Sequence, residues 1–215
     1  MAAGDRPAPS LWRVLLPLGA AVVLSLTGDQ TLYATLATQT SAVGLSVAAV
    51  GIMLAVNRLV RIPGNPAGGL LIDRFGRRRP FIAGMLLGAL STLAYTLARG
   101  FWPFLLSRML WGLSWVLINI SGLSMVLDVT VPENRGRVNG LYQMAFLLGL
   151  SVTAAAGGFL VDALGFVPTL RLCAAATGGG LLIAWLALPE TMPAAPGSRP
   201  PSFPAPGNGL LSPTL

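Results

Sequence analysis

The sequence predicts an all-helical membrane protein with six transmembrane helices. Hydrophobic residues make up 54% of the chain and charged residues only 10%, and the mean hydropathy is +0.73. Soluble domains carry about 25% charged residues, so this composition is not that of a soluble domain. Apolar runs of about 20 residues, long enough to cross a hydrocarbon core of roughly 30 Å, recur along most of the chain. These observations indicate a polytopic helical membrane protein.

Six spans are predicted, and the short loops between them make sequence neighbours antiparallel neighbours in space. Their ranges are 11–37, 45–72, 81–97, 102–127, 141–160 and 167–188. Residues 1–10 form an N-terminal tail, and residues 11–190 form the six-helix transmembrane domain. Residues 191–215 are rich in proline, glycine and serine, which is typical of a disordered tail.

The first span carries Asp29, Gln30 and Tyr33 near its middle. An alternative interpretation makes this segment a cleaved signal peptide, because small residues near "ATQTSA" follow a charged start and an apolar run. Cleavage would leave five spans, and one terminus would change sides. The six-span interpretation keeps the arginine-rich loops and both termini on one side of the membrane.

The arginines outside the spans predict the orientation. Nine lie on one side if the six spans alternate: Arg6, Arg13, Arg74, Arg77, Arg78, Arg79, Arg135, Arg137 and Arg199. Arg99 and Arg171 lie on the other side. Positive residues in short loops remain cytoplasmic, so both termini are predicted to be cytoplasmic.

The second span places arginines inside the membrane. Arg58, Arg61 and Asn65 share one helical face, with Asn57 beside them, and two prolines permit a bend. Charges within spans are costly in hydrocarbon and usually mark an interior pathway. We expect an ion pair from Asp29 to an arginine, or a shared substrate site. The alternative is a static ion pair that only holds helices together.

The fourth span carries a further stripe of polar and aromatic side chains. We expect the first, second and fourth spans to line one polar cavity that serves as a substrate or proton pathway. The candidate pathway residues are Asp29, Tyr33, Asn57, Arg58, Arg61, Arg108, Trp111, Trp115 and Asn119. The tryptophans have an alternative interpretation as lipid-facing or core residues.

The fifth span has a face of small residues at four-residue steps. Gly149, Thr153 and Gly157 form this face, which favours a close helix contact over a ligand site. The loop before this span contains charged residues that we expect to be solvated or to face lipid headgroups. They are Asp128, Glu133, Arg135 and Arg137.

The stretch "GGLLIDRFGR" (68–77) has an echo in "GGFLVDALGF" (157–166), 89 positions later. Each copy closes the second span of a three-span unit. Because each unit has an odd number of spans, the second unit is inverted and its turn lies outside, where the arginines are replaced as the positive-inside rule requires. Inverted repeats of three spans are a transporter architecture. Chance similarity of glycine-rich helix ends is the alternative.

Several classes of chemistry are excluded by residue types that the chain lacks. All 14 basic residues are arginine, so a Walker lysine, a Schiff-base lysine, a histidine base and a histidine metal site are impossible. The one cysteine, Cys173, has no partner for a disulfide and is expected to be a small buried hydrophobe. The net charge of +7 is spread between spans and does not form one face for nucleic acid. We therefore expect no enzyme, no metal, no cofactor and no nucleic-acid partner.

Two motifs resemble those of the major facilitator superfamily of secondary transporters. "GLLIDRFGRRRPF" (69–81) is similar to the family's loop signature between the second and third spans, with each specified position identical or conservatively replaced. "FLLSRMLWG" (104–112) resembles the fourth-span motif, with Arg108 and Gly112 in place and Trp111 where glutamine is usual.

Two further features extend the resemblance to residues 11–191, one six-helix half of a fold that normally has two. The spacing of the fifth-span antiporter motif is matched by Gly140, Gly149 and Gly157. The Gly-Pro pair of that motif is replaced here by Thr153 and Ala154. "ALPET" (187–191) resembles the usual end of the sixth span.

The resemblance implies the N-terminal six-helix half of a secondary active transporter that moves a small organic solute by alternating access. Asp29 is the candidate proton-coupling carboxylate, and the arginine surplus around it mildly favours an anionic substrate, although a second half could reverse that charge. The family's loop acts as a gate latch; a plain positive-inside turn is the alternative. The residues that match this gating loop are Gly69, Asp73, Arg74, Gly76, Arg77 and Arg78.

The resemblance also implies partners and a location. The expected partners are a small-molecule substrate, the lipid bilayer, and a second six-helix half or a second copy of the chain. The expected location is the plasma membrane. The alternative function is a truncated or half-size six-span protein that does not transport and acts as an assembly partner.

Overall fold

The computed structural model describes residues 10–192, and its regular elements are all helices. They are α1 (Leu11–Thr35), α2 (Thr40–Val43), α3 (Val47–Leu59), α4 (Arg61–Phe75), α5 (Arg78–Leu97), α6 (Phe101–Asp128), α7 (Arg135–Leu164) and α8 (Phe166–Ala187). With α3 and α4 taken together, six segments are long and apolar enough to span a membrane, which confirms the six predicted spans. The predicted tails lie outside the described residues, apart from Ser10, Thr191 and Met192.

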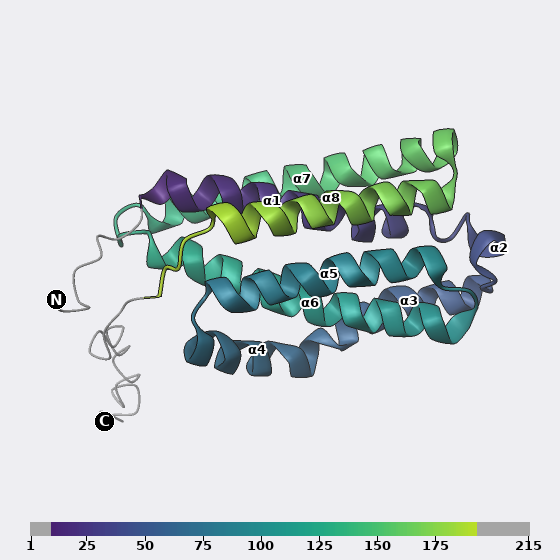
Figure 1. Ribbon diagram of the computed structural model, residues 1–215, viewed down its shortest axis with the longest axis horizontal. Coiled ribbons are helices and arrows are strands. Elements are labelled where there is room, and N and C mark those ends of the chain that lie inside the picture. Colours follow the sequence, from purple (N-terminus) through teal and green to yellow (C-terminus); the bar gives the residue numbers. More distant parts are fainter. Residues whose placement is uncertain (1–9, 193–215) are drawn as a thin grey trace, which may run out of the picture. The chain divides into compact units, whose positions relative to one another are not determined.

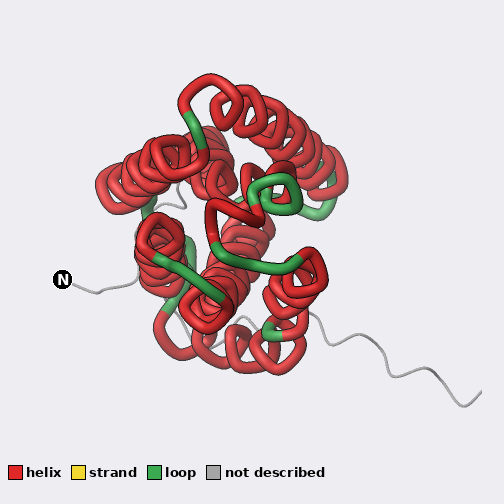
Figure 2. Tube along the Cα trace, turned by 90° about the vertical axis from the view of Figure 1, so that its right-hand side faces the viewer, coloured by secondary structure: helices red, strands yellow, loops and turns green. Residues whose placement is uncertain are grey.

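The helices pack side by side as a bundle (Figures 1 and 2). α1 packs mainly against α7 and α8, α5 packs against α6 and α8, and α3 and α4 both pack against α6. The start of α1 and the end of α8 lie at the same end of the bundle as the α4–α5 connection (Figure 1). The connection between α7 and α8 lies at the opposite end.

Two equivalent glycines form the turns of the predicted inverted repeat. Gly76 ends α4 with φ of +83°, and Gly165 ends α7 with φ of +89°. Residues with a side chain rarely adopt a positive φ, so glycine suits both positions. The two turns lie at opposite ends of the bundle (Figure 1), as an inverted repeat requires.

The second span is interrupted at Val60, where α3 gives way to α4. Pro63 has no N–H to donate to the carbonyl of Leu59, and Pro66 has none for the carbonyl of Ile62, so two helical hydrogen bonds are missing within this stretch. The interruption separates the two arginines of this span, with Arg58 in the last turn of α3 and Arg61 at the start of α4.

Helix α7 begins earlier than predicted. It starts at Arg135, so Arg135 and Arg137 belong to its first turn and not to the loop. The sequence prediction of the span relied on apolar residues, and the first turn of α7 is polar. The short helix α2 was not predicted either; it ends at Gly44, which has φ of +67°.

The small residues of α7 pack against α1. Gly149, Thr153 and Gly157 are all buried. A Cβ added at Gly149 would lie 2.6 Å from a methyl group of Val23, and Gly157 has no room for a Cβ against Thr31. These positions therefore set how closely the two helices approach.

Candidate functional site

An ion pair between α1 and α6 lies inside the helix bundle. The Nη1 of Arg108 is 2.6 Å from the Oδ1 of Asp29, and the two side chains are 0% and 5% exposed. The Nε of Arg108 donates to the carbonyl of Met53 in α3 at 3.2 Å. Arg108 thus links three helices, and its charge is compensated where water cannot reach it.

Asn57 extends this pair to a second arginine. Its Nδ2 donates to the Oδ1 of Asp29 at 3.2 Å, and its own Oδ1 accepts from the Nη2 of Arg61 at 2.9 Å. The chain of contacts therefore runs from Arg61 through Asn57 and Asp29 to Arg108. Each polar contact offsets part of the cost of burying these groups in an apolar bundle.

Aromatic rings lie against all three guanidinium groups. The ring of Tyr33 is 5.1 Å from the guanidinium of Arg108 and 5.8 Å from that of Arg58. The ring of Trp115 is 5.5 Å from the guanidinium of Arg61. These distances are within the range of cation–π attraction.

A cleft of about 300 Å³ opens onto this network. It is lined by residues of α1, α3, α4, α6 and α7: Leu26, Asp29, Gln30, Tyr33, Arg58, Arg61, Trp115, Phe146 and Leu150. Five of the nine predicted pathway residues are among them. Asn57 and Arg108 do not line the cleft, but both bond to Asp29, which does. The structure therefore gathers seven of the nine predicted residues.

Two predicted pathway residues, Trp111 and Asn119, neither line the cleft nor bond to Asp29. Trp111 is fully buried and packs against α5, where a Cβ at Gly88 would lie 2.8 Å from the indole ring. Asn119 is exposed, one turn beyond Trp115. The predicted stripe on α6 is corrected accordingly, because Gly88 leaves a space in the core that the ring of Trp111 fills.

The partner of Asp29 differs from the one we favoured from the sequence. An arginine of the second span was expected, but the salt bridge is made by Arg108. Arg61 reaches Asn57 instead, and Arg58 lies against Tyr33. Four lining residues were not among the predicted pathway residues: Leu26, Gln30, Phe146 and Leu150. The last two have a four-residue spacing on α7, which places them on one face, beside the small-residue positions.

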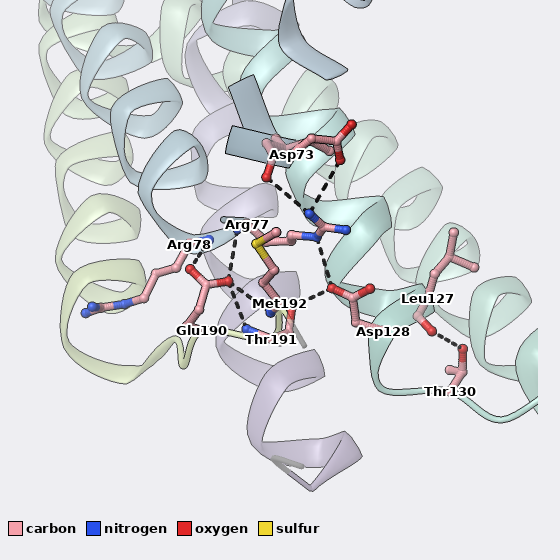
Figure 3. A network of polar contacts seen from close by, with 10 residues as sticks. Asp73, Arg77, Arg78, Leu127, Asp128, Thr130, Glu190, Thr191 and Met192 are labelled. Carbon is pink, nitrogen blue, oxygen red and sulfur yellow. Dashed lines mark hydrogen bonds and ion pairs between the residues drawn. The ribbon is translucent and has the colours of Figure 1, made fainter. Parts of the chain in front are cut away.

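The predicted gating loop forms a second polar network, drawn in Figure 3. The Nε of Arg77 is 3.2 Å from the Oδ2 of Asp128, its Nη1 donates to the carbonyl of Ile72 at 3.1 Å, and the same nitrogen is 3.7 Å from Asp73. The side chain of Asp128 is only 15% exposed. The prediction that Asp128 is solvated or faces headgroups is therefore wrong, because Arg77 folds back over the end of α6.

Glu190, which follows α8 in the sequence, also belongs to this network. Its carboxylate accepts from the backbone N–H of Arg77 at 2.9 Å and of Arg78 at 3.2 Å (Figure 3). These amides stand at the start of α5, where backbone donors lack helical partners and favour a negative charge. Thr191 donates to Asp128 at 3.0 Å. The segment after α8 is thus tied to both α5 and α6.

Sequence reasoning did not assign this role to Glu190. A Cβ at Gly76 would lie 2.6 Å from the Glu190 carboxylate, so a side chain here would displace that carboxylate, and the positive φ of this residue also favours glycine. Of the other loop residues, Asp73 is 74% exposed and Arg74 lies over the ring of Phe75. Gly69 has no neighbour within 4 Å of where a Cβ would stand.

Comparisons with known proteins point to one family. A family model described as "Major Facilitator Superfamily" matches residues 18–211. The chain is 31% identical over 116 residues to "Multidrug resistance protein 2" of Bacillus subtilis (strain 168), covering 54% of this chain and 29% of that protein. It is 31% identical over 152 residues to "Major facilitator superfamily domain-containing protein 10" of Bos taurus, covering 71% of this chain and 32% of that protein.

A solved structure shares the fold. The "Crystal structure of the human organic anion transporter MFSD10 (TETRAN)" aligns with a TM-score of 0.73 and 20% sequence identity. The alignment covers 86% of this chain and 49% of that one. The chain therefore matches about half of this structure and smaller shares of the curated relatives.

Proposed function

The chain belongs to the major facilitator superfamily, and from that premise we propose that it is a six-helix body of a secondary active transporter. The transported solute is a small organic molecule, and transport proceeds by alternating access. The family consists of transporters and not of enzymes, and the six spans make the chain a multi-pass membrane protein. The observation that carries the proposal is the cleft, which reaches a buried acid inside a membrane-spanning bundle.

Asp29 is the proposed proton-coupling group. Among the described residues it is the one carboxylate that lines the cleft, and it is also the partner of Arg108. A proton that arrives at Asp29 removes the charge that balances Arg108. A buried charge that loses its partner is costly, so protonation favours a rearrangement of α1 against α6. This link between proton occupancy and helix position is what coupled transport requires.

A second six-helix body completes the proposed transporter. In the most apolar stretch of each helix, only 22% of the residues of the second span and 17% of the residues of α7 are buried. The corresponding fraction is 50% for both α5 and α6. We assign the exposed faces of the second span and of α7 to contact with a second half or with a second copy of the chain. Glycine at position 69, with open space around it, allows a close approach there.

The loop from Gly69 to Arg78 is the proposed latch between the two bodies. Its arginines lie at the end of the bundle where α1 starts and α8 ends, so this end and both predicted tails are assigned to the cytoplasm. The plasma membrane is the proposed location. In the structure Arg77 is held by Asp73 and Asp128, which ties the loop to the end of α6.

The proposal is tested on the purified full chain. In proteoliposomes that contain a pH-sensitive dye, we expect at least one member of a panel of aromatic anions, cations and neutral solutes to shift the internal pH. Light scattering in detergent should give a mass of two or more six-helix bodies. A stable 22.3 kDa monomer that moves no solute would favour the alternative, a six-span assembly partner that does not transport.

A further inference from the structure

Two arginines of the cleft have no acidic partner. Within residues 10–192 the salt bridges join Arg108 to Asp29 and Arg77 to Asp73 and Asp128, and none includes Arg58 or Arg61. Asp29 is the one acid among the lining residues, and Arg108 already compensates it. The wall of the cleft therefore carries a surplus of two positive charges.

Arg61 still has donors to offer a ligand. Its Nη2 donates to Asn57, while its Nε is buried and has no hydrogen-bond partner among the residues that the structure describes. A guanidinium carries five N–H donors in a planar fork that matches a carboxylate or a sulfonate. Because Asn57 fixes one side of the group, less conformational freedom is lost when an anion binds to the other side.

The same cleft has an aromatic and apolar side. Trp115 lies against Arg61, and its ring is 5.6 Å from that of Phe146. Leu26 and Leu150 complete this side of the wall. An apolar surface with two aromatic rings therefore lies directly beside a guanidinium that no carboxylate neutralises. The volume of about 300 Å³ is near the lower end of the range for small-molecule sites.

We propose that this cleft binds an organic anion with an aromatic body and one carboxylate or sulfonate group. Arg61 contacts the anionic group, Arg58 adds a second positive charge, and the aromatic body packs against Trp115 and Phe146. An organic cation of the same shape would meet two guanidinium groups that no carboxylate neutralises. The inference rests on the proposed function, in which the bound anion is the transported solute.

Three probes of nearly the same shape separate charge from size: 2-naphthoate, the neutral 2-naphthamide and 2-naphthylmethylammonium. Their binding is measured by calorimetry on the full chain in phosphatidylcholine nanodiscs, whose lipid has no net charge. We expect 2-naphthoate to bind at least about tenfold more tightly than either other probe. Equal binding of the anion and the amide, tightest binding of the cation, or no binding of 2-naphthoate would overturn the inference.

Substitutions test whether the preference for the anion arises in the cleft. Arg61→Gln should lower the affinity for 2-naphthoate to that for 2-naphthamide and leave the amide unaffected. Arg99→Gln is the matched control, because it removes the same charge at an exposed position outside the cleft. If Arg61→Gln does not accumulate, Arg58→Gln at an exposed position makes the same test. An equal loss in Arg99→Gln would contradict an anion site at these arginines.

Transport assays on the same probes separate this inference from the proposed function. If 2-naphthoate binds through Arg61 but is not transported across the proteoliposome membrane, the anion site stands and the transporter proposal fails. If the ammonium probe is moved and 2-naphthoate is not, the transporter proposal stands and the anion assignment fails.

Discussion

Asp29 and Arg108 lie 79 positions apart in the sequence, yet they form a buried ion pair with 2.6 Å between their charged atoms. Asp29 also lines the cleft, whereas Arg108 is fully enclosed by protein. One partner is therefore accessible to a proton or a solute and the other is not. A change in the charge of Asp29 therefore alters the electrostatic environment of Arg108 inside the bundle. This asymmetry is the basis of the proposed coupling.

The two acids that pair with the guanidinium of Arg77 should differ in their contribution to stability. Asp128→Asn should lower the free energy of unfolding by about 1–3 kcal/mol, because a largely buried hydrogen bond to a charged group is weakened. Asp73→Asn is the matched control, since Asp73 is 74% exposed and 3.7 Å from Arg77. Thermal unfolding in detergent measures both variants. Equal melting temperatures would contradict the role assigned to Asp128.

Gly76 is expected to tolerate no side chain. Gly76→Ala should destabilise the protein by about 1–2 kcal/mol, because its φ of +83° is strained for alanine. The added methyl group would also displace Glu190 from the start of α5. Gly178→Ala, in open space on α8, should be neutral or slightly stabilising. The same unfolding assay compares the two, and a stable Gly76→Ala protein would refute the capping account.

Adjacent glycines of α7 give a test of helix packing. Gly157 abuts Thr31 of α1, while its neighbour Gly158 has open space around it. Gly157→Ala should therefore reduce the amount of folded protein in the membrane, and Gly158→Ala should not. Quantitative blotting of membrane fractions gives the result. A greater loss in Gly158→Ala would show that α1 and α7 do not pack as described.

Topology is tested by introduced cysteines in a Cys173→Ala background. Arg79→Cys, beside the gating loop, should react with a membrane-impermeant maleimide only after the cells are opened. Arg99→Cys, at the other end of the bundle, should react in intact cells. Labelling of position 79 from outside would contradict the proposed cytoplasmic location of the loop and of both termini.

The sequence was sufficient for the features that depend on local pattern. Apolar length predicted the six spans, and the repeated glycine predicted the turns at Gly76 and Gly165. The break in the second span follows from prolines at 63 and 66, whose missing N–H groups are visible in the sequence. The start of α7 was missed because its first turn is polar.

The features that depend on how helices pack could not be predicted in the same way. Arg58, Arg61 and Arg108 all lie within predicted spans, so composition alone did not identify which arginine pairs with Asp29. Glu190 reaches the start of α5 from 113 positions away, a relationship that no local pattern carries. Trp111 was assigned to a polar stripe because the space beside Gly88 in α5 cannot be seen from α6 alone.

The central claim, that Asp29 couples protons to transport, is tested by membrane abundance and proton flux in Asp29→Asn, Arg108→Gln and the double variant. We expect Asp29→Asn to reach nearly the abundance of the unmodified protein, because asparagine keeps the shape of the acid and Arg108 retains its bond to Met53. Solute-driven proton movement in proteoliposomes should be lost, because the amide does not titrate.

A purely structural pair gives the opposite pattern in the same measurement. Removing one partner would leave a buried charge unpaired, which costs about 3–5 kcal/mol, so both single variants would be scarce in the membrane. The double variant would then recover its abundance. The coupling role of Asp29 would be contradicted if both single variants were scarce and the double variant recovered, or if proton flux were unchanged in Asp29→Asn. The account predicts that the Asp29→Asn protein is abundant in the membrane and shows no proton flux.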